Sequence, residues 1–343
     1  MTAFTKIKSP VGVKTSVGLD IGSHAVKIIS LSSTGDSQKL SGLALKTIQD
    51  GTKESLASAI TKAVEESKIS AKEVNISVSG PSVIVRFVSM PKMREDELKG
   101  AIRFEAEKFI PFNVNDCIVD SQILKRDEHE NKIDIILVAA KRDHIQERIS
   151  AVEKAGFSVG LVDVDGFALA NSFLKNLPPP TPLKTFALLN IGAKFTNLSI
   201  ITQGRICFVR DVGIGSDDFT SSISKGLGVD KGAAESLKMA GKEKLAEILS
   251  CTRPVINNLL DDVKLSFSYN ENQCGRSIDE IYVSGGGSYL AGLDELFQET
   301  FGLGAPHHWN PLAFLDTSSA AIDKEMIGKT EGSFAVAAGL ALR

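Results

Sequence analysis

The sequence has no long hydrophobic run, few cysteines and little net charge. Its strongest apolar stretch, residues 133–140, is short and interrupted by Asp134. It therefore predicts a buried strand, since a membrane-spanning helix needs roughly 20 apolar residues. The net charge of −3 gives no long-range attraction to nucleic acid or anionic lipid. We expect no nucleic-acid partner and no direct insertion into a membrane.

Cysteine usage and the N-terminus both bear on where the protein resides. The cysteines are far apart and form no C-x-x-C motif, which argues against a disulfide framework or a zinc site and for a reducing compartment. Residues 1–16 are polar and lack the apolar core of a signal peptide. We expect a cytoplasmic protein with a loose tail over residues 1–15. The cysteines are Cys117, Cys207, Cys251 and Cys274.

The chain is organised around a strand–turn–strand pattern at residues 17–31. Apolar, strand-like runs flank a turn that contains Asp20 and Gly22. Gly22 lets the main chain approach a ligand closely, and Ser23 and His24 add hydrogen-bond donors at the bend. The Asp20 carboxylate is suited to a hydrated divalent cation. The pattern favours a phosphate ligand, although ordinary hairpins use the same residue types.

The same pattern recurs in the second half of the chain. Residues 187–198 align without gaps with residues 17–28, and each hairpin leads to a third strand and then a helix. This internal duplication predicts two lobes of like topology whose hairpins face each other across a cleft. The Pro-rich segment 178–182 is the predicted linker between the lobes.

A third loop with the character of an anion site follows the strand predicted at residues 278–284. The run Gly285-Gly286-Gly287-Ser288 lies between this strand and a helix expected from Tyr289. Backbone N–H groups and the helix dipole would then point at a common anion. The alternative is a tight strand-to-helix turn, although three glycines exceed what such a turn needs.

The order of the predicted elements indicates an α/β fold of two lobes, with a smaller unit inserted in each. A helix–strand–strand–helix unit at residues 90–156 is typical of a compact α+β subdomain, and residues 229–275 are almost wholly helical. The remaining ranges are 16–89 plus 157–177 for the first lobe and 183–228 plus 276–343 for the second.

Together these features resemble the actin/Hsp70/sugar-kinase ATPase superfamily. Residues 20–27 and 190–197 resemble its two phosphate loops, and residues 284–293 resemble its adenosine loop. The small-residue segments 163–171 and 334–342 resemble its two connecting helices. The resemblance implies a duplicated, ribonuclease H-like (actin-like) fold with a subdomain inserted in the first lobe.

Within that superfamily the chain is similar to the PilM family, actin-like proteins of type IV pilus assembly that are related to the cell-division protein FtsA. The segments that carry this similarity lie outside the shared loops, at residues 101–112, 138–142 and 160–169. The resemblance implies that ATP and Mg²⁺ bind between the lobes, with Asp20 organising Mg²⁺ through water. The implied nucleotide-binding residues are Asp20, Gly22, Ser23, His24, Lys27, Gly192, Lys194, Thr196, Glu235, Lys238, Gly285, Gly286, Gly287 and Ser288.

Four positions in or near these loops carry alternatives or departures. Glu235 and Lys238 would contact ribose and adenine, or form an ordinary surface ion pair one helical turn apart. Asp165 would be the catalytic residue that orients the attacking water, or a helix N-cap. Asn190 stands where the superfamily has a second Asp, and an amide cannot act as a base. We therefore expect ATP binding with slow or absent hydrolysis.

The resemblance also implies a partner. The protein would hold the N-terminal cytoplasmic peptide of a bitopic, PilN-like inner-membrane protein in a groove beside the inserted subdomain, and so lie at the inner membrane without touching lipid. The resemblance is also compatible with other pilus assembly proteins as partners and with a homo-oligomer. The alternatives are a sugar-kinase-like phosphotransferase, which Asn190 disfavours, and an FtsA-like filament. No basic amphipathic tail follows residues 334–342, which disfavours the filament.

Overall fold

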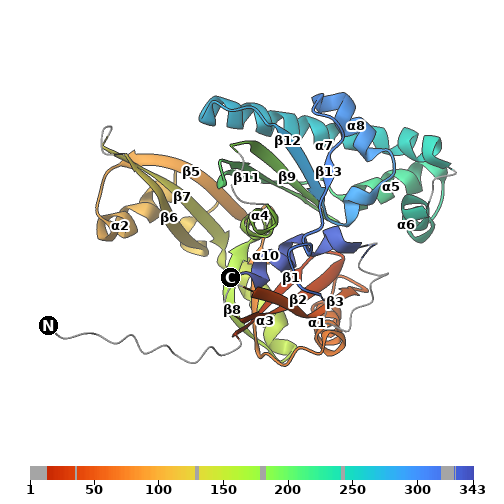
Figure 1. Ribbon diagram of the computed structural model, residues 1–343, viewed down its shortest axis with the longest axis horizontal. Coiled ribbons are helices and arrows are strands. Elements are labelled where there is room, and N and C mark those ends of the chain that lie inside the picture. Colours follow the sequence, from red (N-terminus) through yellow and green to blue (C-terminus); the bar gives the residue numbers. More distant parts are fainter. Residues whose placement is uncertain are drawn as a thin grey trace.

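The computed structural model describes residues 14–34, 37–127, 131–177, 183–240, 244–317, 328 and 330–343 (Figure 1). The predicted linker 178–182 and most of the predicted tail lie outside the described residues. Lys14 and Thr15, expected in the tail, instead open the first strand. No helix in the described ranges is long and apolar enough to cross a bilayer.

The first lobe is a five-stranded sheet in the order β3-β2-β1-β4-β8. β1 to β3 form an antiparallel meander, and β4 and β8 add in parallel to β1. Helices α1 and α3 cover one face, where their apolar residues share a core with β1 and β2. The bounds are β1 Lys14–Ile21, β2 Ala25–Thr34, β3 Ser37–Thr47, α1 Lys53–Ser67, β4 Glu73–Val78, α3 Arg142–Lys154 and β8 Ser158–Val164.

The second lobe repeats this topology, with its sheet in the order β11-β10-β9-β12-β13. β9 to β11 are again an antiparallel meander, extended by parallel strands. Four helices share one core with this sheet. The predicted duplication is therefore confirmed strand by strand. The bounds are β9 Thr185–Ile191, β10 Thr196–Thr202, β11 Arg205–Val212, α5 Ser216–Leu227, α6 Lys231–Ala240, α7 Leu245–Cys274, β12 Glu280–Ser284, α8 Leu293–Phe301 and β13 His307–His308.

Two small-residue helices, α4 Asp165–Asn176 and α10 Ala335–Ala341, cross between the sheets at the centre of the molecule (Figure 1). Their contact is so close that a Cβ on Gly339 would lie 1.7 Å from the carbonyl oxygen of Ala168. Small side chains permit this approach because they let two helix backbones come together. The two connecting helices expected from the sequence therefore form the junction of the lobes.

The inserted subdomain is a three-stranded sheet, β5-β7-β6, with helix α2 packed on it. The expected start at residue 90 falls inside β5, which pairs along its whole length with β7. Near the expected end at 156, α3 packs Ala151 and Val152 on the first lobe, whereas its Ile145 packs in a cluster with β5 and β7. The subdomain's sheet thus runs from residue 83 to 141. The bounds are β5 Val83–Pro91, α2 Glu95–Ala106, β6 Cys117–Asp127 and β7 Lys132–Lys141.

The helix expected from Tyr289 does not begin there. Gly286–Tyr289 is a single 3₁₀ turn, Leu290 is extended, and α8 starts at Leu293 after Gly292, whose φ is +83°. The glycine loop is therefore followed by a short turn, and it lacks the dipole of an adjoining α-helix.

Candidate functional site

A cavity of about 570 Å³ lies between the lobes, and both hairpin turns line it. It also receives the glycine loop after β12 and the helix pair α5–α6. The residues anticipated for nucleotide and catalysis that line it are Asp20, Gly22, Ser23, His24, Lys27, Asp165, Gly192, Lys194, Glu235, Lys238, Gly286 and Gly287. The lobes thus bring together side chains from two halves of the chain, as the duplication predicted.

The two hairpin turns have the same backbone geometry. Gly22 donates its N–H to the carbonyl of Ala25 at 3.1 Å, and Gly192 does the same to Phe195 at 2.9 Å. A Cβ at either glycine would lie within 3.0 Å of that same carbonyl oxygen. Only glycine fits the tight turn, which leaves the loop backbone facing the cavity.

The residue pairs beneath the turns differ between the lobes. Asp20 is opposite Lys27 across the first hairpin, and their side chains form an ion pair at 3.0 Å. At the equivalent place Asn190 faces Asn197, and the amides hydrogen-bond at 2.9 Å. A charged pair in one lobe is matched by a neutral pair in the other.

Asp20 is a buried carboxylate in a mixed electrostatic environment. Burial raises its pKa above the usual value, the nearby Lys27 ammonium lowers it, and Asp165 raises it again. Lys27, expected as a partner for phosphate, is held by Asp20 in this structure. A cation near Asp20 therefore has to share that carboxylate with Lys27.

Glu235 and Lys238 form part of the cavity wall. Lys238 is 6% exposed, and its Nζ contacts Glu235 Oε2 at 2.7 Å and Thr220 Oγ1 at 2.9 Å. Partial burial raises the pKa of Glu235, but hydrogen bonds from Lys238 and Thr220 outweigh it, so the pKa lies below its usual value. The two side chains do form the ion pair one helical turn apart, but its lysine is buried and its glutamate is partly exposed, so it differs from a fully exposed surface pair.

Three of the anticipated residues do not reach the cavity. Thr196 is buried, and its hydroxyl donates to the carbonyl of Ile214 at 2.8 Å. Ser288 is also buried and donates to the carbonyl of Gly285 at 2.8 Å. Gly285 packs on β9, where a Cβ would lie 2.5 Å from the oxygen of Ile191. These residues shape the loops, and Gly286 and Gly287 are the part of the glycine run that faces the cavity.

Asp165 is the first residue of α4, and the N-cap position belongs to Val164. The N-cap interpretation is therefore wrong. The side chain instead lines the cavity beside His144 and Arg148 of α3, two residues that the sequence did not single out. Burial lowers the pKa of His144, and Arg148 donates to the carbonyl of Ile21 at 2.5 Å. No sequence signal marked them, because their helix was assigned to the inserted subdomain.

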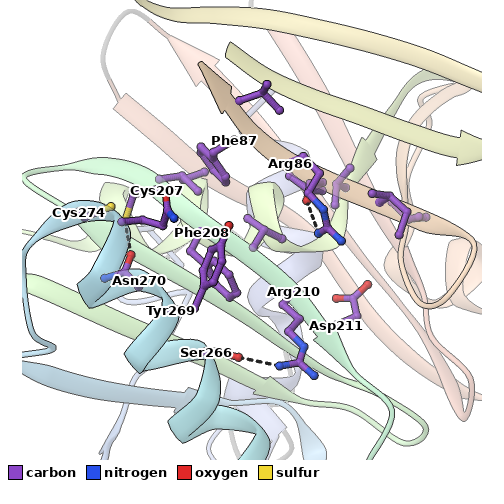
Figure 2. Close-up of a pocket in the computed structure, with 18 of the residues that line it drawn as sticks. Arg86, Phe87, Cys207, Phe208, Arg210, Asp211, Ser266, Tyr269, Asn270 and Cys274 are labelled. Carbon is purple, nitrogen blue, oxygen red and sulfur yellow. Dashed lines mark hydrogen bonds between the residues drawn. The ribbon is translucent and has the colours of Figure 1, made fainter. Parts of the chain in front are cut away.

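A second cavity, the β5–β11 groove, has a volume of about 940 Å³. Its walls are β5, β11 and the last turns of α7, and the strands meet where Val85 and Val209 are buried in one cluster. β5 and β11 are both edge strands of their sheets. Figure 2 shows the aromatic side chains Phe87, Phe208 and Tyr269 on the groove, with arginines beside them.

Two lobes of like topology, with paired glycine hairpins at one cavity and crossed small-residue helices between the sheets, define an actin-like fold. A family model described as "Type IV pilus assembly protein PilM" matches residues 18–343. The chain belongs to the PilM family of type IV pilus assembly proteins.

One solved structure agrees with this family assignment, and a second agrees with the fold alone. The chain is similar, at 28% identity and a TM-score of 0.85, to a structure described as a PilM-PilN type IV pilus biogenesis complex, covering 96% of this chain and 98% of that one. It is also similar in fold to the ethanolamine utilization protein EutJ from Carboxydothermus hydrogenoformans, at 14% identity and a TM-score of 0.57, covering 98% of this chain and 92% of that one.

Proposed function

We propose that this protein is a cytoplasmic, ATP-binding scaffold of type IV pilus assembly. It binds the N-terminal cytoplasmic peptide of a PilN-like inner-membrane protein in a nucleotide-dependent way, and hydrolyses ATP slowly or not at all. The observation that carries the proposal is the pairing of two glycine hairpins at one interlobe cavity, immediately beside a groove whose walls include two edge strands.

The cavity suits a nucleotide in size and in chemistry. Its volume of about 570 Å³ is within the range of small-ligand sites. At Gly286 the nearest atom to an added Cβ is 3.8 Å away, so its backbone is open to a ligand. In the proposal, Gly22, Ser23, His24, Gly192 and Lys194 hold the phosphates, Gly286 and Gly287 lie at the α-phosphate and ribose, and Glu235 and Lys238 contact ribose and adenine. Asp20 orients the water shell of Mg²⁺.

Slow hydrolysis follows from the side chains around the cavity. Asn190 is neutral, and its amide nitrogen already donates a hydrogen bond to Asn197. Asp165 is then the remaining candidate to orient a water, and in the proposal it does so without a second carboxylate from the other lobe. We expect steady-state turnover below about one per second, at or under the low end for enzymes.

The β5–β11 groove suits an extended peptide. An edge strand presents unpaired backbone groups to which a peptide can add as a further strand. The lining combines apolar and aromatic residues with charged ones, among them Arg86 and Arg205. We propose that the groove takes an extended segment of the PilN-like peptide in which apolar residues alternate with an acidic one.

Substitution of one groove residue tests this assignment. Tyr269 is 52% exposed on the groove and packs on Phe208 at 5.7 Å between ring centroids. We expect Tyr269→Ala to weaken binding of the labelled N-terminal peptide of the neighbouring membrane protein at least about tenfold, typical of losing an aromatic anchor. Leu303→Ala, at an exposed apolar residue outside the groove, is the control. Peptide binding that both variants leave unchanged would remove the groove assignment, and no binding at all would remove the scaffold function.

A further inference from the structure

Four polar side chains form a continuous hydrogen-bonded ladder across the second sheet, on β12, β9, β10 and β11. Ser284 donates to Asn190 Oδ1 at 3.4 Å, and Asn190 Nδ2 donates to Asn197 Oδ1 at 2.9 Å. Asn197 Nδ2 donates to Asp211 Oδ1 at 2.8 Å. The backbone N–H of Gly80, from the first lobe, donates to Asp211 Oδ2 at 2.6 Å. The ladder therefore crosses from one lobe to the other.

The ladder connects two cavities, through its two asparagines on one side and Asp211 on the other. Asn190 and Asn197 line the nucleotide cavity, whereas Asp211 and Gly80 line the β5–β11 groove. Pro81 and Phe195 line both, so the cavities share a wall. The ring of Phe195 lies against Gly80, where an added Cβ would be 3.2 Å from it. No other side chain is needed to connect the sites.

The charge on Asp211 fixes the direction of every hydrogen bond in the ladder. An ionised carboxylate only accepts, so Asn197 must turn its NH₂ group toward Asp211 and its carbonyl toward Asn190. The NH₂ group of Asn190 then has to donate to Asn197, and the carbonyl oxygen of Asn190 is left facing Ser284. A protonated Asp211 carries an O–H donor. The side-chain amides of Asn197 and Asn190 can then both flip by about 180°, which exchanges their NH₂ groups and carbonyl oxygens. Asn190 then presents its NH₂ group, a donor suited to phosphate.

We propose that this ladder is a reversible relay between the groove and the nucleotide cavity, and that Asn190 is a positioning residue whose exposed amide end is set by the charge at Asp211. The inference rests on the proposed nucleotide function of the cavity. The relay also gives a reason for an amide at position 190. With a carboxylate there, Asn197 would lie between two carboxylates, and its carbonyl oxygen would face one of them without a donor.

The electrostatic surroundings of Asp211 are consistent with a group that changes charge near neutral pH. Its pKa is raised to about 6, and burial is the largest cause. The Asp165 carboxylate on α4 adds to the rise, whereas the hydrogen bonds from Asn197 and Gly80 oppose it. Asp165 also lines the nucleotide cavity, and Arg86 and Arg210 line the groove on the other side. Figure 2 shows Asp211 on the groove beside Arg210.

The first arm of the test needs no nucleotide. Carboxyl ¹³C NMR titration of the full chain measures the pKa of Asp211. We expect Asn190→Asp to raise that pKa by at least about one unit, because only one of the two carboxylates can then accept from Asn197. The double variant N190D/D211N places the amide donor at position 211 and the carboxylate acceptor at position 190. Both hydrogen bonds of Asn197 are then restored with reversed direction, so this variant should recover the thermal stability that N190D loses. An unchanged Asp211 pKa in N190D, or stability effects that simply add, would overturn the relay.

The second arm adds a non-hydrolysable ATP analogue with Mg²⁺. We expect bound analogue to raise the pKa of Asp211, so that affinity increases about tenfold per unit of that shift as the pH falls through 6. Asn190→Ala cuts the ladder at the cavity without changing any charge and should remove most of the shift. A shift that persists in N190A would show through-space electrostatics and overturn the relay. An analogue that does not bind to any variant would instead overturn the nucleotide function, and the first arm would still decide the ladder.

Discussion

At the residue scale, the informative feature is the inequality of two equivalent positions. Asp20 and Asn190 occupy the same place in the duplicated hairpins, yet one belongs to an ion pair and the other to an amide pair. The sequence alone identified this departure, because the duplication aligned the two hairpins. It did not identify Asn197 or Asp211, since the partners of Asn190 become adjacent only when β9, β10 and β11 pair.

Replacing Asp20 tests its part in holding the cation. We expect Asp20→Asn to keep the shape of the hairpin, to leave Lys27 without its carboxylate, and to remove the Mg²⁺ dependence of binding. Calorimetry with an ATP analogue should show at least about a tenfold loss of affinity in Mg²⁺, as for other groups that orient metal-bound ligands. Asp261→Asn, at an exposed acid on α7, is the control. An affinity in Mg²⁺ equal to that of the wild type would contradict the role of Asp20.

Asp211 makes stability depend on pH in a defined direction. Its pKa in the folded protein, about 6, is above the ordinary value of 3.8, so the folded state binds the proton more tightly. The resulting stabilisation is complete below about pH 4 and is lost as the pH rises through 6. We expect Asp211→Asn to be more stable than the wild type at pH 7.5, by up to about 3 kcal/mol, and similar to it at pH 4. Urea unfolding across this range measures the difference, and a variant that is less stable at pH 7.5 would refute the prediction.

At the element scale, the strands and most helices follow from local pattern, whereas their assignment to units does not. The sequence pattern alternates over residues 83–88 and predicts a helix over residues 142–155, close to the observed β5 and α3. Their neighbours are set by tertiary pairing, with β5 on β7 and α3 on the first lobe. The start of α8 was missed because Gly292, with φ +83°, separates a 3₁₀ turn from the helix.

The contact of α4 with α10 makes a sharp prediction at this scale. A methyl group at Gly339 would overlap the carbonyl oxygen of Ala168 at 1.7 Å, and such overpacking costs about 1–3 kcal/mol. Gly100 is also within a helix, α2, but an added Cβ there meets nothing within 4 Å. Urea unfolding should show Gly339→Ala destabilised by that amount and Gly100→Ala unchanged or stabilised by up to about 1 kcal/mol. Equal effects at both glycines would contradict the close helix contact.

At the scale of the whole molecule, the duplication allowed the two lobes and the cavity between them to be predicted from the sequence. The β5–β11 groove could not be placed in the same way, because its walls come from the first-lobe insertion and from the edge of the second sheet. The two cavities share Pro81 and Phe195, so occupancy of one has a direct physical route to the other.

The central claim is that nucleotide in the cavity controls peptide binding in the groove. Fluorescence anisotropy of the labelled N-terminal cytoplasmic peptide of the PilN-like partner, with and without the Mg²⁺–ATP analogue, tests it most directly. We predict that the analogue changes the peptide affinity at least about fivefold, within the usual range of coupling between sites, and that Asp20→Asn removes the change. Peptide binding of equal affinity with and without bound analogue would contradict the account.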